Sequence, residues 1–176
     1  MLLRKINAIL GLLATVFLLD HAIFHSVWML SKGRVEQSAP VGPWILAGLM
    51  GAHAFISIML AVSAHMEGKQ GKYNQYPKMN RATIFQRISG VLLIIFTVLH
   101  ITGATGVMTP PPVIHTIVPP IFFTIALIHT AISADKAFIT LGIGNARFIK
   151  AVSVVVKVLC AVTLVACIIG FYLYVW

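Results

Sequence analysis

The most restrictive feature of this sequence is a series of long apolar stretches, separated by short segments that carry most of the charges. A helix needs about 20 residues to cross the hydrocarbon core of a bilayer. Stretches of that length lie at residues 6–30, 41–65, 84–107, 113–133 and 148–176. Because the bilayer core offers no hydrogen-bond partners to the backbone, we expect each stretch to be a helix. The sequence therefore predicts an all-α integral membrane protein with five transmembrane helices.

Composition excludes a water-soluble enzyme. Hydrophobic residues make up 59% and charged residues 10% of the 176 positions, whereas about 25% of an ordinary globular chain is charged. The formal net charge of +9 is compatible with nucleic acid, but the basic residues lie in short clusters between apolar runs rather than on one face. We expect no nucleic-acid partner. Since few residues remain outside the stretches, residues 1–176 are expected to form a single transmembrane domain in contact with membrane lipid.

The distribution of Lys and Arg predicts how the chain is oriented. Of its 13 basic residues, all but Lys32, Arg34 and Lys157 fall on one side of the predicted helices, and an excess of basic residues marks the cytoplasmic side. The N-terminus is therefore expected in the cytoplasm and the C-terminus outside, across the cell inner membrane. Tryptophans favour the membrane interfaces, and all three fall at the predicted outer one: Trp28, Trp44 and Trp176.

The first stretch resembles a secretory signal, because Arg4 and Lys5 precede an apolar run. That run continues to Leu30 without a convincing small-residue cleavage site, which such signals carry. A retained first transmembrane helix is the favoured interpretation.

Histidines inside the apolar stretches indicate the chemistry. His21, His53, His100 and His129 each fall in a different one of the first four stretches, and the fifth contains none. An ionisable group within a bilayer is costly and marks a pathway or a cofactor. A neutral imidazole bonded between helices would explain one of them, but one histidine in each of four helices favours a shared cause.

Haem is that shared cause in our interpretation. Two imidazoles on facing helices can supply both axial ligands of one iron, so four histidines predict two haems in a bundle of the first four helices. A zinc site would require converging ligands with Cys or acidic residues nearby, and these stretches contain almost no acidic residues. No CxxCH attachment motif is present, so we expect non-covalent haem b.

Depth along the helices suggests one pairing. His21 lies sixteen residues beyond Lys5, and His100 lies thirteen residues beyond Arg87. Both histidines therefore rise roughly 20–24 Å from the cytoplasmic side. These two are expected to share an outer haem.

The remaining two histidines are left to share an inner haem, on weaker arithmetic. His53 is fourteen residues from Glu67, whereas His129 is only six residues from Asp135. Level placement requires the fourth helix to continue past Asp135 or to tilt.

Four segments around these histidines resemble a known family. They are "FLLDH" ending at His21, "AHAF" around His53, "QRISGVLLIIFTVLH" ending at His100 and "IHTAISADKAFITLGI" around His129. In this order they are similar to the diheme cytochrome b membrane anchor of succinate:quinone oxidoreductases, that is, succinate dehydrogenases and quinol:fumarate reductases of the single-anchor type. The resemblance covers residues 11–143 and implies the axial pairs His21 with His100 and His53 with His129.

The resemblance also implies a function. Such anchors bind two b haems and a quinone, usually menaquinone, and exchange electrons with a cytoplasmic iron–sulfur subunit. A flavoprotein partner carrying FAD interconverts succinate and fumarate. By this comparison the chain is the quinone-reacting subunit of an enzyme, and the dicarboxylate chemistry belongs to its partners.

Other residues are weaker candidates. His25 lies one turn from His21 and is a rival ligand, or a group beside the outer haem or the quinone. Arg87 and Ser89 in "QRISG" resemble a segment that serves quinone or propionate binding in related anchors, although an arginine beginning a helix needs no such role. A quinone site is predicted at the outer end of the bundle, beside the first and third predicted helices, where the quinone would exchange protons. His25 is expected to lie there together with three further residues: Asp20, Glu36 and His115.

Two other classes of function remain open at this stage. A cytochrome b561-like reductase would use different helix pairs and lacks the "QRISG…H" spacing. A small transporter or channel would leave the four-histidine pattern unexplained.

Overall fold

The computed structural model describes residues 2–34, 41–69, 81–107 and 112–175. These residues form five helices and, within those ranges, no strand. The helices are α1 (Leu2–Leu30), α2 (Val41–Lys69), α3 (Arg81–Ala104), α4 (Pro112–Leu141) and α5 (Ala146–Val175). Each is long and apolar enough to cross a membrane. The prediction of an all-α, multi-pass membrane protein with five transmembrane helices is confirmed.

Local sequence explains where these helices end. At the end of α4, Gly142 has a φ of 71°, and the next residue donates from its backbone N to the Phe138 carbonyl at 3.2 Å. This is the glycine-ended closure common at helix C-termini, where only glycine adopts positive φ without strain. The Asn145 side chain then accepts from the Phe148 backbone N at 2.9 Å and caps the start of α5.

Helix α4 continues six residues past Asp135, to Leu141. The expected end at residue 133 was therefore too early. The polar pair Asp135–Lys136 lies inside the helix, which can carry such charges where it nears the bilayer surface. A fourth helix that continues past Asp135 is what the sequence required if His129 is to lie at the same depth as His53.

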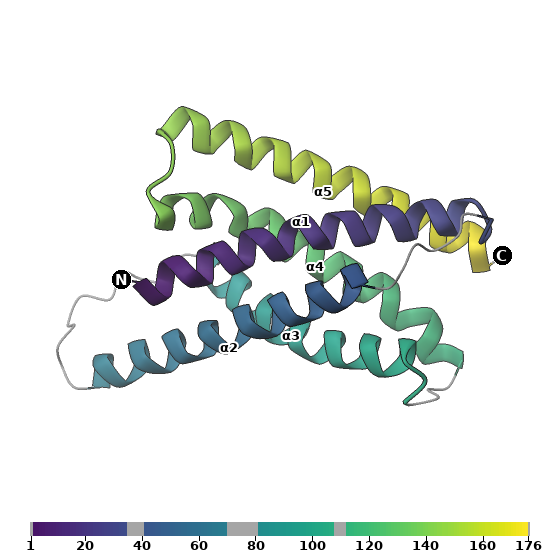
Figure 1. Ribbon diagram of the computed structural model, residues 1–176, viewed down its shortest axis with the longest axis horizontal. Helices are drawn as coiled ribbons and strands as arrows, with labels where there is room; N and C mark the ends of the chain where they lie inside the picture. The colour runs from purple at the N-terminus through teal and green to yellow at the C-terminus, as the bar shows by residue number, and fades with distance from the viewer. Residues whose placement is uncertain (1, 35–40, 70–80, 108–111, 176) are drawn as a thin grey trace.

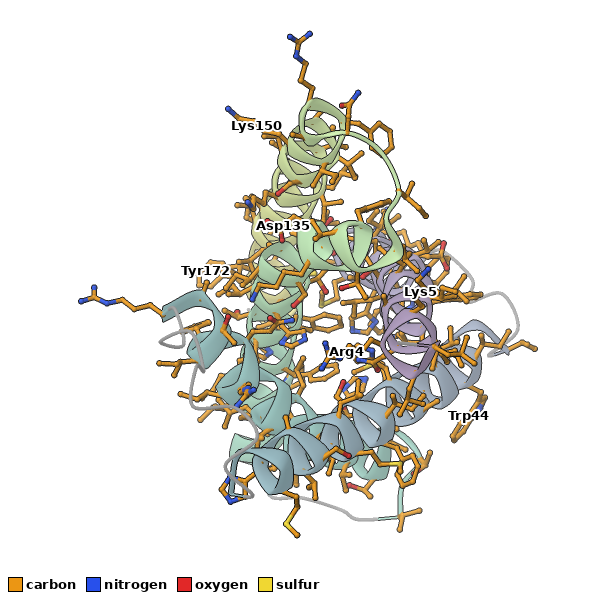
Figure 2. The ribbon with its side chains drawn as sticks, turned by 90° about the vertical axis from the view of Figure 1, so that its left-hand side faces the viewer. Arg4, Lys5, Trp44, Asp135, Lys150 and Tyr172 are labelled. Carbon is orange, nitrogen blue, oxygen red and sulfur yellow. The ribbon has the colours of Figure 1, made fainter. Side chains whose placement is uncertain are left out.

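The first four helices form a ring, and α5 lies outside it. Around the ring, α1 contacts α2 and α4, α3 contacts α4, and α2 touches α3 only slightly. Helix α5 packs along the edge formed by α1 and α4, as the end-on view in Figure 2 shows. In this order α1 lies diagonally opposite α3, and α2 lies diagonally opposite α4.

The ring has two ends, which Figure 1 displays from left to right. We call the end where α1, α3 and α5 begin the near end, and the end where they finish the far end. Helices α2 and α4 run the opposite way (Figure 1). The near end holds the Arg4, Lys5 and Lys150 labelled in Figure 2.

The apolar core lies midway along the ring. One cluster of buried side chains joins all four ring helices: Ala14, Leu18, Leu46, Leu93, Phe122 and Ala126. On the outer surface, by contrast, large apolar side chains are exposed, such as Val16 and Phe55 at 64% each. Such a surface would be unfavourable in water but suits contact with lipid.

Candidate functional site

The four predicted ligand histidines lie on diagonally opposed helices. His21 on α1 and His100 on α3 form one pair, with ring centroids 6.3 Å apart and ring planes at 74°. His53 on α2 and His129 on α4 form the other pair, and their side chains lie close enough to interact electrostatically. Each pair therefore faces across the axis of the ring. We call His21–His100 the far pair and His53–His129 the near pair, after the end each lies toward.

The two pairs lie at different depths. On α1, Gly11 is next to His53, and ten residues separate it from His21. On α3, Gly90 is next to His129, and ten residues separate it from His100. Ten residues of helix rise about 15 Å. The pairs are thus stacked along the ring, with the central apolar cluster between them.

In the near pair, His53 is oriented by a backbone group. Its Nδ1 lies 3.0 Å from the carbonyl oxygen of Asn7 on α1. Because a carbonyl can only accept, His53 donates from Nδ1, and its Nε2 keeps a free lone pair. The side chain of Asn7 makes a second contact with α2, because its Nδ2 donates to the Ser57 hydroxyl at 3.0 Å. This bond links α1 to α2 one turn from His53.

The second near-pair histidine is oriented by a hydroxyl. Ser89 on α3 donates to the Gln86 carbonyl at 3.1 Å, and its oxygen lies 2.8 Å from His129 Nδ1. Since the hydroxyl hydrogen is already used, Ser89 accepts from His129. His129 therefore also presents an unprotonated Nε2. Metal-binding histidines commonly donate their other ring N–H in this way, which fixes the tautomer and the ring orientation.

Two glycines make room for these rings. A Cβ at Gly11 would lie 3.0 Å from His53 Cε1, and a Cβ at Gly90 would lie 3.5 Å from His129 Cε1. Gly11 and Gly90 therefore let α1 and α3 approach the imidazoles of the two helices beside them. In contrast, a Cβ at Gly48 or Gly51 on α2 would meet nothing within 4 Å.

The far pair is surrounded by aromatic rings. His100 stacks on Phe122 at 5.0 Å between centroids, with planes at 17°, and both far histidines lie about 6.2 Å from Phe123. His25 stacks on His21 at 6.0 Å. Among the described residues, neither His21 nor His100 has a hydrogen bond to a ring nitrogen. Stacking holds these rings and leaves their nitrogens available.

This donor set fits haem. Two imidazoles sharing one metal through bonds near 2 Å place their ring centroids about 6 Å apart, and the far pair meets that spacing at 6.3 Å. Two buried hydroxyls also lack any partner in the described part of the chain: Thr97 Oγ1 and Ser133 Oγ. They lie one turn from His100 and His129, respectively. Buried polar atoms are normally hydrogen-bonded, so both hydroxyls are available to bond a group held in the interior.

A cavity lies beside His25 at the far end. Its volume is about 100 Å³, and it is bounded by α1, α4 and α5, including Trp28, Phe123, Leu164 and Phe171. Pro119 and Pro120 of α4 also line it. The cavity therefore opens on the α4–α5 side of His25, whereas the sequence suggested the α1–α3 side.

The other predicted residues are not all gathered at one place. Ser89 lies beside the near pair, where it bonds His129, while Arg87 is exposed on α3. Asp20 is exposed on the outer side of α1, although it interacts electrostatically with His21. Glu36 lies outside the described residues. His115 belongs to α4, but its side chain is outside the described part.

Sequence reasoning missed several residues of the near half. Asn7 acts through its backbone carbonyl, and Gly11 acts by having no side chain, so neither offers a chemical signal in a sequence. Lys136 and Ser133 were detectable: they follow His129 by seven and four residues, a spacing that places all three on one helix face.

Comparisons of this chain with family models, with curated proteins and with solved structures give no match. The family resemblance of the histidine segments therefore stays a prediction.

Proposed function

We propose that this chain is a membrane electron-transfer subunit that holds two b haems, one on each histidine pair. The observation that carries the proposal is the near pair: two imidazoles on diagonal helices, each donating its Nδ1 proton to a neighbouring helix and leaving Nε2 free. A neutral imidazole whose Nδ1 carries the proton has a lone pair on Nε2 that can coordinate a metal. The far pair, at 6.3 Å, supports the same role.

Each haem, when bound, supplies a site that accepts and releases one electron within the membrane. The chain's own residues do the rest. The near-pair imidazoles are held by Asn7 and Ser89, and the far-pair imidazoles by Phe122, Phe123 and His25. The two histidine pairs lie about 15 Å apart along the ring, a separation that favours electron transfer between the two haem sites. The apolar cluster between them excludes water.

We further propose that the chain is the anchor of a succinate:quinone oxidoreductase, with its near end in the cytoplasm. Support comes from the four resembling segments and from the basic residues, ten of which the sequence assigns to the cytoplasmic side. A cytoplasmic iron–sulfur subunit would exchange electrons with the near haem, and its FAD flavoprotein partner would convert the dicarboxylate. The membrane would then be the cell inner membrane.

A quinone is proposed as the redox partner at the far end, in the cavity beside His25. Its apolar wall suits a lipophilic ring, and His25 contributes the polar group that orients it. Because His25 stacks on His21, a ring in this cavity would lie next to the far haem. Menaquinone is the form that the resemblance favours.

Haem content tests the core of the proposal. The purified full-length chain is expected to contain two non-covalent haems by reduced pyridine haemochrome assay, with low-spin spectra. One haem or none in correctly folded protein would refute it, and would favour a non-redox membrane protein instead.

Partner identity needs a separate test. Purification from native membranes in mild detergent is expected to bring down an iron–sulfur protein and a flavoprotein with succinate-dependent haem reduction. A two-haem chain that purifies without either partner and is reduced by another donor would instead support a cytochrome b561-like reductase.

Filling the cavity tests the quinone site. Leu164→Phe should raise the KM for quinone and leave both haem spectra intact, because Leu164 lines the cavity. Leu159→Phe is the matched control, since Leu159 is 44% exposed on the same helix and is not part of the cavity wall. Equal turnover in both variants would place the quinone elsewhere.

A further inference from the structure

The near half of the ring contains a lysine without an acidic partner. Lys136 Nζ on α4 lies 2.6 Å from Gln86 Oε1 and 3.4 Å from Thr83 Oγ1 on α3. Both are neutral acceptors, and the contacts are partly buried. The adjacent Asp135 carboxylate accepts from the Lys136 backbone N at 2.9 Å, and no ion pair to Lys136 is found among the described residues. A partly buried ammonium held only by neutral groups is a suitable place for an anion.

A second group on the same helix face also lacks a partner. Ser133 Oγ is buried and makes no hydrogen bond in the described part of the chain. It lies one turn from His129 and one turn from Lys136. A serine within a helix often bonds the carbonyl four residues back, but Ser133 does not, so its hydroxyl is free to donate elsewhere.

Together these residues form a stripe on α4 that runs from the proposed iron ligand toward the near end. His129, Ser133 and Lys136 are spaced by four and three residues, which places them on one face over about 10 Å. Haem b carries two propionate carboxylates on one edge of its ring. A carboxylate at this stripe would accept a hydrogen bond from the Ser133 hydroxyl and form an ion pair with the Lys136 ammonium.

We propose that Lys136 and Ser133 bind a propionate of the near haem and thereby turn its carboxylate edge toward the near end. The inference rests on the proposed function, because it needs a haem on the His53–His129 pair. Lys136 then makes a charge-assisted hydrogen bond, which is roughly twice as strong as a neutral one. Gln86 and Thr83 keep the ammonium in place before the haem arrives.

This arrangement has an electrical consequence. A cation beside the near haem disfavours the more positive, oxidised state and so raises the midpoint potential of that haem. The far haem lies about 15 Å away along the ring and is affected much less. Lys136 thus separates the properties of two sites that use the same ligand types.

Redox titration of variants tests the inference. Lys136→Gln should shift one of two midpoint potentials downward, the one belonging to the haem that His129→Ala removes, and should weaken retention of that haem in detergent. Ser133→Ala should do the same to a smaller extent, and Lys136→Arg should restore most of the potential. Lys157→Gln is the matched control, since Lys157 is exposed on α5 and should change neither potential.

A second arm identifies the anion as the propionate. The full-length apoprotein is reconstituted with haem b or with its dimethyl ester, whose carboxylates are blocked. With the ester, wild type and Lys136→Gln should retain the near haem equally well in detergent, because neither can form the charge-assisted hydrogen bond to a propionate. If Lys136→Gln weakens retention of the ester as much as retention of haem b, Lys136 acts on another anion, such as a lipid phosphate, and the inference is overturned.

Failure of the inference is distinct from failure of the proposed function. Two haems whose potentials are unchanged in Lys136→Gln would overturn only the propionate site. Absence of haem from the wild-type chain would overturn both.

Discussion

The two histidine pairs use the same side chain but are held by different forces. In the near pair, hydrogen bonds from Nδ1 to the Asn7 carbonyl and the Ser89 hydroxyl fix both the tautomer and the rotation of each ring. The neighbouring helices provide these acceptors, so α1 positions a histidine on α2, and α3 positions a histidine on α4.

In the far pair, aromatic contacts replace hydrogen bonds. Phe122 and Phe123 stack against the far histidines, and His25 lies against His21. Stacking defines the plane of a ring but not which nitrogen carries the proton. The comparison teaches that hydrogen bonds select the tautomers of the near histidines, whereas no contact among the described residues selects those of the far histidines.

The strongest test of this comparison removes the ligands one at a time. His53→Ala and His129→Ala should each remove or convert the same haem, while His21→Ala and His100→Ala should damage the other one. Each variant loses one of two axial ligands, so one component of the redox titration should disappear. If His21→Ala and His53→Ala removed the same component, the diagonal pairing would be wrong.

A smaller effect is expected from the hydrogen bond to His129. Ser89→Ala should weaken haem binding at the near site by about 10- to 100-fold, the usual consequence of losing the group that orients a metal-bound histidine. The far haem should keep its spectrum. Ser153→Ala is a suitable control, because Ser153 is also buried but lies on α5; haem affinities are measured by titration of the apoprotein.

Crowding the near pair should have a graded effect. Gly11→Ala places a methyl group 3.0 Å from His53, and Gly90→Ala places one 3.5 Å from His129, while Gly48→Ala meets no neighbour. We expect the low-spin spectrum of the near haem to change most in Gly11→Ala, less in Gly90→Ala and not at all in Gly48→Ala. Similar spectra in all three would mean that the interior adjusts and that these glycines do not define the site.

The smallest effect on haem binding is expected from a substitution of His25, the third histidine of the far half. His25→Phe keeps an aromatic ring beside His21 but removes the polar nitrogens, so both haems should remain while quinone turnover falls. The measurements are haem content and steady-state quinone reduction. Loss of the far haem in His25→Phe, with retention in His21→Ala, would show that His25 is the ligand.

Much of the fold was predictable because the bilayer imposes it. Stretches of sufficient length had to be helices, and histidines in the first four of them pointed to one interior. The end of α4 was placed too early because Asp135 and Lys136 look like a helix boundary when read as charges alone. The structure shows that Lys136 instead bonds to Gln86 on the neighbouring helix α3.

The site was predictable only where chemistry resides in a side chain. His21, His53, His100 and His129 were identifiable by residue type and position. The carbonyl of Asn7 and the missing side chain of Gly11 are contributions of the backbone, which depend on the packing of α1 against α2. Asp20 was expected near the outer haem from its place beside His21, but successive residues on a helix point about 100° apart, and its side chain is exposed on the other face.

The slight contact between α2 and α3 has a consequence for how the protein matures. Helix α2 is joined to the ring mainly through α1, so in the newly inserted chain the seam between α2 and α3 is the part least secured by protein contacts. A haem held by His53 and His129 would connect α2 to the diagonally opposite helix and close that seam from within. Because ligand binding to the folded form adds to its stability, cells starved of haem should accumulate a chain in which α2 is the first helix exposed to proteolysis.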